Sequence, residues 1–326
     1  MPFTTGKRPF TPTWDIALFP MLQSPQSNEE RTYLIMKKVL AQIGKALAYF
    51  LTYLLTSNVI SLIVSCIVGY VKGREYGAAG MDRDAAMAAL QSDNAAMTGI
   101  CLLLGAIATL IVYFIIEKVK KSSLAKETDI KAVSPKHIIL TVIGALGGMV
   151  FMNFIMSILP IPAELTGDLA NGMSKLTAYP FWQALLANCI FVPIIEEVVF
   201  RGYIFNRLSK AMPKIVAAII SSVVFGICHG SLLWAIWAFV LGMIICLARI
   251  KTGSIVPGII FHIIMNTFAM VVSYYPVLEN MTEGVMYALT AAGAVLLAVY
   301  VVGFFLERGK VSEKSKAEVV IAPVEK

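Results

Sequence analysis

The chain has 326 residues, of which 58% are hydrophobic and 14% charged, and its mean hydropathy is +0.77. Soluble globular chains carry roughly 25% charged residues, so this composition excludes an ordinary soluble domain. The net charge of +7 does not indicate nucleic-acid binding, because the basic residues fall in alternate loops between apolar runs. The five cysteines all lie in apolar runs, so we expect them to pack and to form no disulfide framework.

Apolar runs of about 20 residues recur along the chain, and this is the length that a helix needs to cross a bilayer. We therefore expect an all-α fold, a polytopic membrane bundle of about eight transmembrane helices. The predicted spans are residues 46–71, 95–116, 137–159, 181–208, 214–231, 233–249, 254–272 and 283–306.

The spans divide the chain into five predicted parts. These are a cytoplasmic tail with a surface helix (1–45), three accessory helices (46–159), a core of four helices (180–272), a last helix (283–306) and a disordered cytoplasmic tail (307–326). The first apolar run begins near Ala46, too far along the chain for a cleavable signal peptide, so we expect it to stay in the mature protein.

Lysine and arginine set the predicted orientation. With the N-terminus inside, the segments that face the cytoplasm hold 23 of these residues and the outer segments hold 4. Cytoplasmic loops carry the excess of positive charge in membrane proteins. Both termini are therefore predicted to be cytoplasmic.

Ionisable residues interrupt the apolar run of the fourth span. Glu196 and Glu197 are adjacent there, and Arg201 follows one turn after Glu197. Residues four apart face each other on a helix, so Glu197 and Arg201 should form an ion pair. Glu196 points elsewhere, which leaves it without a local partner and suits it to the role of a general base. The alternative is that both glutamates only hold helices together.

Two of the three histidines also lie inside apolar runs. His229 ends the fifth span, one turn after Phe225, and His262 precedes Asn266 by four residues on the seventh span. An imidazole and a carboxamide on one helix face can stabilise a developing oxyanion. Packing and helix–helix hydrogen bonds are the alternative roles. His137 lies at the edge of a span, and we expect it to anchor that helix at the interface.

The depths of these residues constrain the fourth helix. If it ended at Arg201, Glu196 would lie near the inner face, roughly 15 Å from the depth of His229 at 1.5 Å per residue. We therefore expect a longer, tilted or kinked helix that continues to about Leu208, with Arg207 and Lys210 near the inner boundary.

Three motifs occur in order on separate spans, namely Glu196-Glu-x-x-x-Arg201, Phe225-x-x-x-His229 and His262-x-x-x-Asn266. Their combination resembles the CPBP family, the group of CAAX prenyl protease 2 enzymes and their bacterial abortive-infection relatives. The resemblance covers roughly residues 180–272. It implies an intramembrane endopeptidase that cleaves a membrane-associated protein or peptide. The simple loops between the spans favour a prokaryotic plasma membrane as its location.

The resemblance also implies a role for each residue of the motifs. Glu196 would activate water with help from His229, and His262 and Asn266 would stabilise the oxyanion. Glu197 and Arg201, with Phe225, would shape the wall that faces the substrate. We expect no cofactor; the alternative is a zinc ion bound by Glu196, His229 and His262, although the chain lacks the His-Glu-x-x-His signature.

Two other functions remain open at this point. The same fold could serve a non-catalytic membrane scaffold or a bacteriocin-immunity protein. A transporter could use Glu196 and Glu197 as a proton relay, but the sequence shows no internal repeat to support an inverted-repeat fold. A Glu196→Gln variant separates the protease from the scaffold, because only the protease needs the base.

Overall fold

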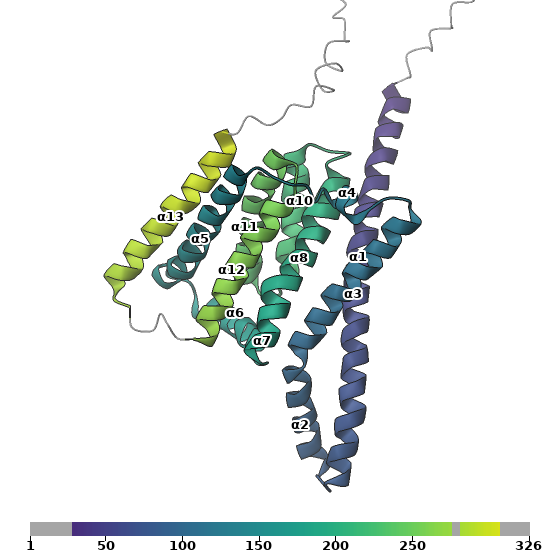
Figure 1. Ribbon diagram of the computed structural model, residues 1–326, viewed down its shortest axis with the longest axis vertical. Coiled ribbons are helices and arrows are strands. Elements are labelled where there is room, and N and C mark those ends of the chain that lie inside the picture. The colour runs from purple at the N-terminus through teal and green to yellow at the C-terminus, as the bar shows by residue number, and fades with distance from the viewer. Residues whose placement is uncertain (1–27, 276–280, 307–326) are drawn as a thin grey trace, which may run out of the picture.

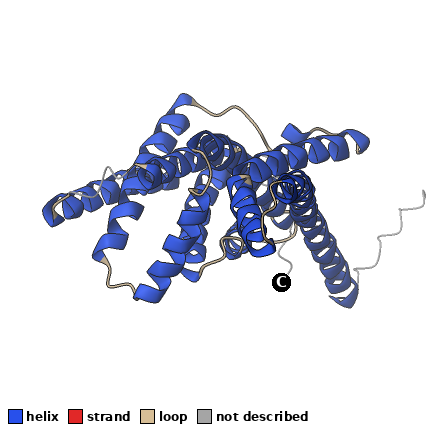
Figure 2. Cartoon of the chain, turned by 90° about the horizontal axis from the view of Figure 1, so that it is seen from below, coloured by secondary structure: helices blue, strands red, loops and turns tan. Residues whose placement is uncertain are grey.

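The computed structural model describes residues 28–275 and 281–306, and these residues fold into a bundle of helices (Figures 1 and 2). The predicted disordered tail at 307–326 lies outside the described residues, as do residues 1–27 of the predicted N-terminal tail. In the described part of the chain every regular element is helical, which confirms the all-α fold. A helix satisfies its own backbone hydrogen bonds, as a segment in lipid must.

The longer helices are α1 (Asn28–Ala78), α2 (Arg83–Ala96), α3 (Thr98–Val119), α5 (Pro135–Ile158), α6 (Ala163–Leu176), α10 (Lys214–Ile227), α11 (Leu232–Thr252), α12 (Val256–Tyr274) and α13 (Glu283–Leu306). The short helix α4 (Leu124–Thr128) lies between α3 and α5. Between α6 and α10 run α7 (Phe181–Ala184), η1 (Leu185–Phe191), α8 (Val192–Glu196), η2 (Glu197–Ile204) and α9 (Phe205–Leu208).

Seven of the described helices are long and apolar enough to cross a membrane. The fifth predicted span, residues 214–231, corresponds to α10, which has only 14 residues. At 1.5 Å per residue, a helix of this length spans about 21 Å, less than the hydrocarbon thickness of about 30 Å. The turn at His229 and Gly230 ends α10 early, and α11 packs against it.

The first helix is longer than its predicted span of 46–71. The predicted surface helix and that span form one helix of 51 residues, α1. It packs along α3 and reaches the segment from η2 to α9. Its second half and α2 project beyond the rest of the bundle at the bottom of Figure 1. The start of α1 and the end of α13 lie at the same end of the bundle, and which side of the membrane this end faces stays a prediction (Figure 1).

Small residues bring α5 and α13 close together at one edge of the bundle (Figure 1). A Cβ atom at Gly147 would lie 2.6 Å from Leu296 Cβ, and one at Gly293 would lie 2.5 Å from the Phe151 backbone nitrogen. Gly144, three residues before Gly147 on α5, packs against the Tyr300 ring. Close backbone approach at small residues is a common means of helix association in membranes.

Candidate active site

One long helical segment carries the first motif. Residues Phe181–Leu208 are helical throughout, as the depth argument predicted, but two stretches within them are π-helical. The first ends before Pro193, whose ring and missing N–H disturb the hydrogen-bond ladder of an α-helix. The second begins at Glu197, directly after Glu196. Such π-helical turns are frequent at functional sites, and these two place the motif where the helix geometry changes.

Glu197 and Arg201 form the predicted ion pair. Arg201 Nη1 donates to Glu197 Oε1 over 2.8 Å, and both side chains are fully buried. Two glycines make room for the pair: a Cβ at Gly258 would lie 2.7 Å from Glu197 Oε2, and one at Gly242 would lie 2.9 Å from Arg201 Nη2. Larger residues at either position would collide with the charged groups.

His262 lies between the two glutamates. Its Nδ1 is 3.2 Å from Glu197 Oε1, and its Nε2 is 3.6 Å from Glu196 Oε2. Since Glu197 Oε1 also accepts from Arg201, one carboxylate connects the guanidinium to the imidazole. The ion pair therefore fixes the orientation of the His262 ring and turns Nε2 toward Glu196, in the way that a buried carboxylate orients a functional histidine.

His229 faces the same region from the turn after α10. Its Nδ1 lies 2.8 Å from the Phe225 carbonyl oxygen. A carbonyl can only accept, so Nδ1 is assigned the proton and Nε2 is left as an acceptor. The Phe225 ring holds both histidines edge-on, with centroid distances of 4.6 Å to His229 and 5.7 Å to His262.

Two cavities open on these residues. The first, here called the Glu196 cavity, has a volume of about 300 Å³. The second, the His262 cavity, has a volume of about 310 Å³. His229, Trp234 and Asn266 line both, so the cavities meet at these three side chains.

The two adjacent glutamates differ in their access to this space. The Glu196 side chain keeps 14% exposure and lines its cavity, whereas Glu197 keeps none. Asn266 donates through Nδ2 to the Asn188 carbonyl oxygen over 2.9 Å, which leaves the second hydrogen of its amide for another acceptor. Glu196, His229, His262 and Asn266 thus come together, from three separate segments of the chain.

The other three residues of the motifs are buried and lie away from the two cavities. Glu197, Arg201 and Phe225 are fully buried and line neither cavity in the described structure. The Arg201 guanidinium carbon lies 4.4 Å from the Phe225 ring centroid, in a cation–π contact. This geometry favours positioning of the two histidines, and contact of these three residues with a substrate stays a prediction.

The accessory helices supply part of the Glu196 cavity. Tyr53, Ser57 and Ser61 line it from α1, and Cys101 lines it from α3. The sequence analysis missed these residues, although the spacing of four between Tyr53, Ser57 and Ser61 puts three hydroxyl groups on one face of α1. That pattern predicts a shared helix face but does not indicate which cavity the face lines.

A zinc site was the alternative to a metal-free centre. Carboxylate and imidazole are suitable zinc ligands, and Glu196, His229 and His262 supply that donor set. Within residues 28–275 and 281–306, however, no group of three or more His, Cys, Asp or Glu side chains is arranged to hold a metal ion. In this arrangement the three residues do not fit a metal, and no step proposed below passes through one.

Comparison with known proteins supports the resemblance drawn from the motifs. A family model described as "Type II CAAX prenyl endopeptidase Rce1-like" matches residues 178–268, which include all three motifs. The "Putative membrane peptidase YdiL" of Bacillus subtilis (strain 168) is 33% identical over 93 residues, or 28% of this chain and 38% of that protein. The "Membrane-embedded CAAX protease MroQ" of Staphylococcus aureus (strain USA300) is 32% identical over 88 residues, which cover 25% of this chain and 36% of that protein.

A third relative is the "UPF0177 protein YxdF" of Lactococcus lactis subsp. lactis (strain IL1403). It is 29% identical over 129 residues, which cover 37% of this chain and 71% of that protein. The chain thus spans little more than a third of the length of YdiL and MroQ, and no solved structure matches it. With seven apolar helices among its described residues, the chain is a multi-pass membrane protein, as predicted. Residues 178–268, which carry the three motifs, are thus similar to the CAAX prenyl endopeptidase family, and this similarity supports the resemblance of the chain to CPBP-family membrane proteases.

Proposed function

We propose that this chain is an intramembrane endopeptidase that cleaves a membrane-associated protein or peptide. The observation that carries the proposal is the partly exposed Glu196 carboxylate, which lines a cavity together with the polar side chains of His229 and Asn266 in an otherwise apolar bundle. Peptide hydrolysis in a membrane needs a water molecule, a base and oxyanion donors in one hydrated space. These side chains can supply the base and the donors.

In the first step, a water molecule between Glu196 and His229 attacks the scissile carbonyl carbon. Glu196 takes one proton from this water, while His229 Nε2, the free acceptor nitrogen, accepts a hydrogen bond from it. General-base catalysis of this kind typically contributes about 10²–10⁴ in rate.

In the second step, the negative charge on the tetrahedral oxygen is stabilised by hydrogen bonds. The free N–H of Asn266 Nδ2 and a proton on His262 Nε2 would be the donors. Two carboxylates flank His262, Glu197 at Nδ1 and Glu196 at Nε2. The carboxylic acid of Glu196 then returns its proton to the leaving amine, and the peptide bond breaks.

Hydrolysis by this route needs no metal, and chelation tests that part of the proposal. We expect the purified protein to retain most of its peptidase activity in EDTA or 1,10-phenanthroline and to hold much less than one zinc per chain by elemental analysis. One tightly bound zinc per chain, lost in a His229→Ala variant together with activity, would replace the glutamate mechanism with a metal mechanism.

The substrate and the activity itself can be tested together in cells. Membrane peptides from cells with the wild-type chain are compared by mass spectrometry with those from cells with Glu196→Gln. We expect at least one membrane-associated precursor to accumulate uncleaved in the variant, and the sequence at its cleavage site will show whether a prenylated cysteine is required. If the two peptide profiles agree while the biological effect persists, the chain acts as a non-catalytic scaffold or immunity protein.

A further inference from the structure

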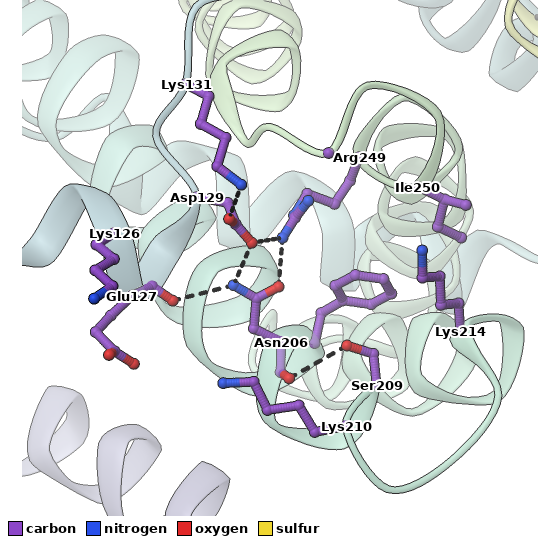
Figure 3. A pocket seen from close by; sticks show the side chains of 12 residues that line it. Lys126, Glu127, Asp129, Lys131, Asn206, Ser209, Lys210, Lys214, Arg249 and Ile250 are labelled. Atoms are coloured by element: carbon purple, nitrogen blue, oxygen red, sulfur yellow. Dashed lines mark hydrogen bonds and ion pairs between the residues drawn. The ribbon is translucent and has the colours of Figure 1, made fainter. Parts of the chain in front are cut away.

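The helical segment Phe181–Leu208, which carries Glu196 and Glu197, is here called the catalytic helix. A third cavity lies at the end of the bundle where this helix ends, and it shares no lining residue with the two cavities of the active site (Figure 3). This basic pocket has a volume of about 400 Å³. It is bordered by the end of α9, the turn into α10, the end of α11 and the segment between α4 and α5. Its lining includes five basic residues (Lys126, Lys131, Lys210, Lys214 and Arg249) and two acidic ones (Glu127 and Asp129).

The two carboxylates of the pocket are already paired. Asp129 binds Lys131 and, over 2.6 Å, Arg249 Nη2, while Glu127 binds Arg207. Among the described residues, the ammonium groups of Lys126, Lys210 and Lys214 have no hydrogen bond or ion pair. Figure 3 shows these three side chains spread around the pocket. The residues that line this cavity therefore carry an excess of three positive charges.

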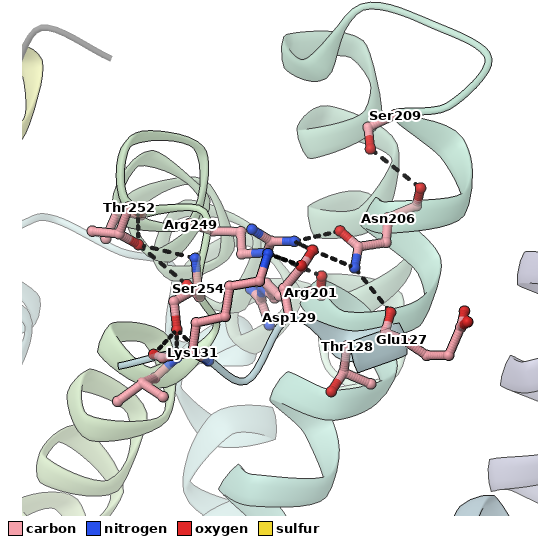
Figure 4. Close-up of polar contacts among 12 residues, drawn as sticks. Glu127, Thr128, Asp129, Lys131, Arg201, Asn206, Ser209, Arg249, Thr252 and Ser254 are labelled. Atoms are coloured by element: carbon pink, nitrogen blue, oxygen red, sulfur yellow. Dashed lines mark hydrogen bonds and ion pairs between the residues drawn. The ribbon is translucent and has the colours of Figure 1, made fainter. Parts of the chain in front are cut away.

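The floor of the pocket is fixed in place by a buried polar network (Figure 4). Arg249 is 5% exposed, and its guanidinium donates to Asp129 and to Asn206 Oδ1. Asn206 Nδ2 donates in turn to Asp129 Oδ2 over 3.0 Å. Ser254 Oγ donates to the Lys131 carbonyl oxygen over 2.7 Å, which ties the segment after α4 to the loop between α11 and α12. A ligand would thus meet a preorganised surface.

Two further features favour an anion. Burial, together with the nearby positive charge of Arg207, lowers the pKa of Lys210 and outweighs the opposite effect of Glu127 and Asp129. Helix α10 begins at Lys214, and no side chain caps its N-terminus. The free N–H groups of a first helical turn attract negative charge.

We propose that the basic pocket binds a phosphate group, presented either by the headgroup of an anionic phospholipid or by free phosphate. Membrane spans end at this pocket, and Phe205 and Ile250 add apolar surface to its lining, both of which suit a lipid. Basic pockets between transmembrane helices on the cytoplasmic side are typical sites for such headgroups, and the charge distribution predicts that this side is cytoplasmic.

The site also connects to the catalytic helix. Arg249 Nε lies 3.5 Å from the carbonyl oxygen of Arg201, and Asn206 follows Arg201 on the same helical segment. A phosphate held by the lysines would therefore steady the end of the helix that carries Glu196 and Glu197. Binding itself needs no peptide hydrolysis, so it is testable whether or not the proposed activity is correct.

The test measures binding of dioctanoyl phosphatidylglycerol to the full chain in a neutral detergent, by thermal shift and native mass spectrometry. The variant Lys126→Gln/Lys210→Gln/Lys214→Gln removes the unpaired charges. The matched control, Lys37→Gln/Lys38→Gln/Lys121→Gln, removes three exposed lysines that lie outside the pocket. Each lysine near an anionic headgroup contributes about fivefold to the affinity. We therefore expect the Kd for phosphatidylglycerol to rise about fivefold in Lys210→Gln alone and roughly 100-fold in the triple variant. The control variant should change the Kd little.

Two further ligands identify the source of the phosphate. Dioctanoyl phosphatidylcholine has the same chains without net charge, and inorganic phosphate has the charge without chains. If inorganic phosphate displaces phosphatidylglycerol and stabilises the protein equally, the ligand is free phosphate; if it does neither, the ligand is the lipid. Equal binding of phosphatidylglycerol to the wild type and Lys210→Gln, or an equal loss in the control variant, would overturn the proposal.

Discussion

Replacing Glu196 with Gln should lower the peptidase activity of the purified protein by about 10²–10⁴ while leaving its stability nearly unchanged. The amide keeps the size of the side chain, but it cannot take a proton from water. Only the carboxylate of Glu196, not that of Glu197, lines the active-site cavity, so its neighbour cannot replace it. The rate is measured by single-turnover cleavage of a peptide substrate in detergent or lipid discs, with thermal unfolding measured in parallel.

Glu164→Gln is the matched control for this experiment. Glu164 is exposed on α6, outside the motifs, so the same chemical change should leave the rate at the wild-type level. A Glu196→Gln variant that retained more than a tenth of the wild-type rate would exclude Glu196 as the base.

The polar residues of the site were predictable because placing each of them in an apolar, membrane-spanning segment costs free energy. Charged groups and histidines in apolar runs must find partners or water, so Glu196, His229 and His262 could be expected to meet. The ion pair of Glu197 and Arg201 follows from helical spacing alone. Family resemblance added their roles, which no spacing rule could supply.

Other parts of the site could not be predicted from local patterns. Tyr53 lies 143 residues before Glu196, and only the packing of α1 against the core brings it to the same cavity. Hydroxyl groups are tolerated in apolar helices through bonds to their own backbone, as Thr52 and Thr109 show, so their presence signals no site. No pattern in the sequence marked the π-helical turns η1 and η2 either.

Hydropathy also predicted the positions of the helices better than it predicted their lengths. It found the apolar run at 214–231, but it could not show that the chain turns at Gly230, where φ is +84°. Likewise, the polar residues between Asn28 and Lys45 obscured the continuity of α1, since a helix that leaves the hydrocarbon can continue with exposed polar side chains. Hydropathy measures the tendency to enter lipid, and helix ends depend on turns and packing as well.

Replacing Arg201 with Ala should destabilise the folded protein by about 3–5 kcal/mol, the second large effect we expect. Both partners of the ion pair are fully buried, so the variant leaves the Glu197 carboxylate without its cation in an apolar environment. The change also removes the cation–π contact with Phe225, whose ring supports His229 and His262. Thermal or denaturant unfolding in detergent measures the loss, and Arg74→Ala, on the projecting part of α1, is the control.

The double variant Glu197→Leu/Arg201→Met separates stability from positioning. Replacing a buried ion pair with apolar residues of similar size is often neutral or stabilising, so this variant should recover most of the stability lost in Arg201→Ala. It should not recover activity, because His262 Nδ1 no longer faces the Glu197 oxygen that orients its ring. Recovery of both stability and rate would mean that the pair only fills space. Loss of both would mean that the pair holds the helices together and that its effect on His262 is secondary.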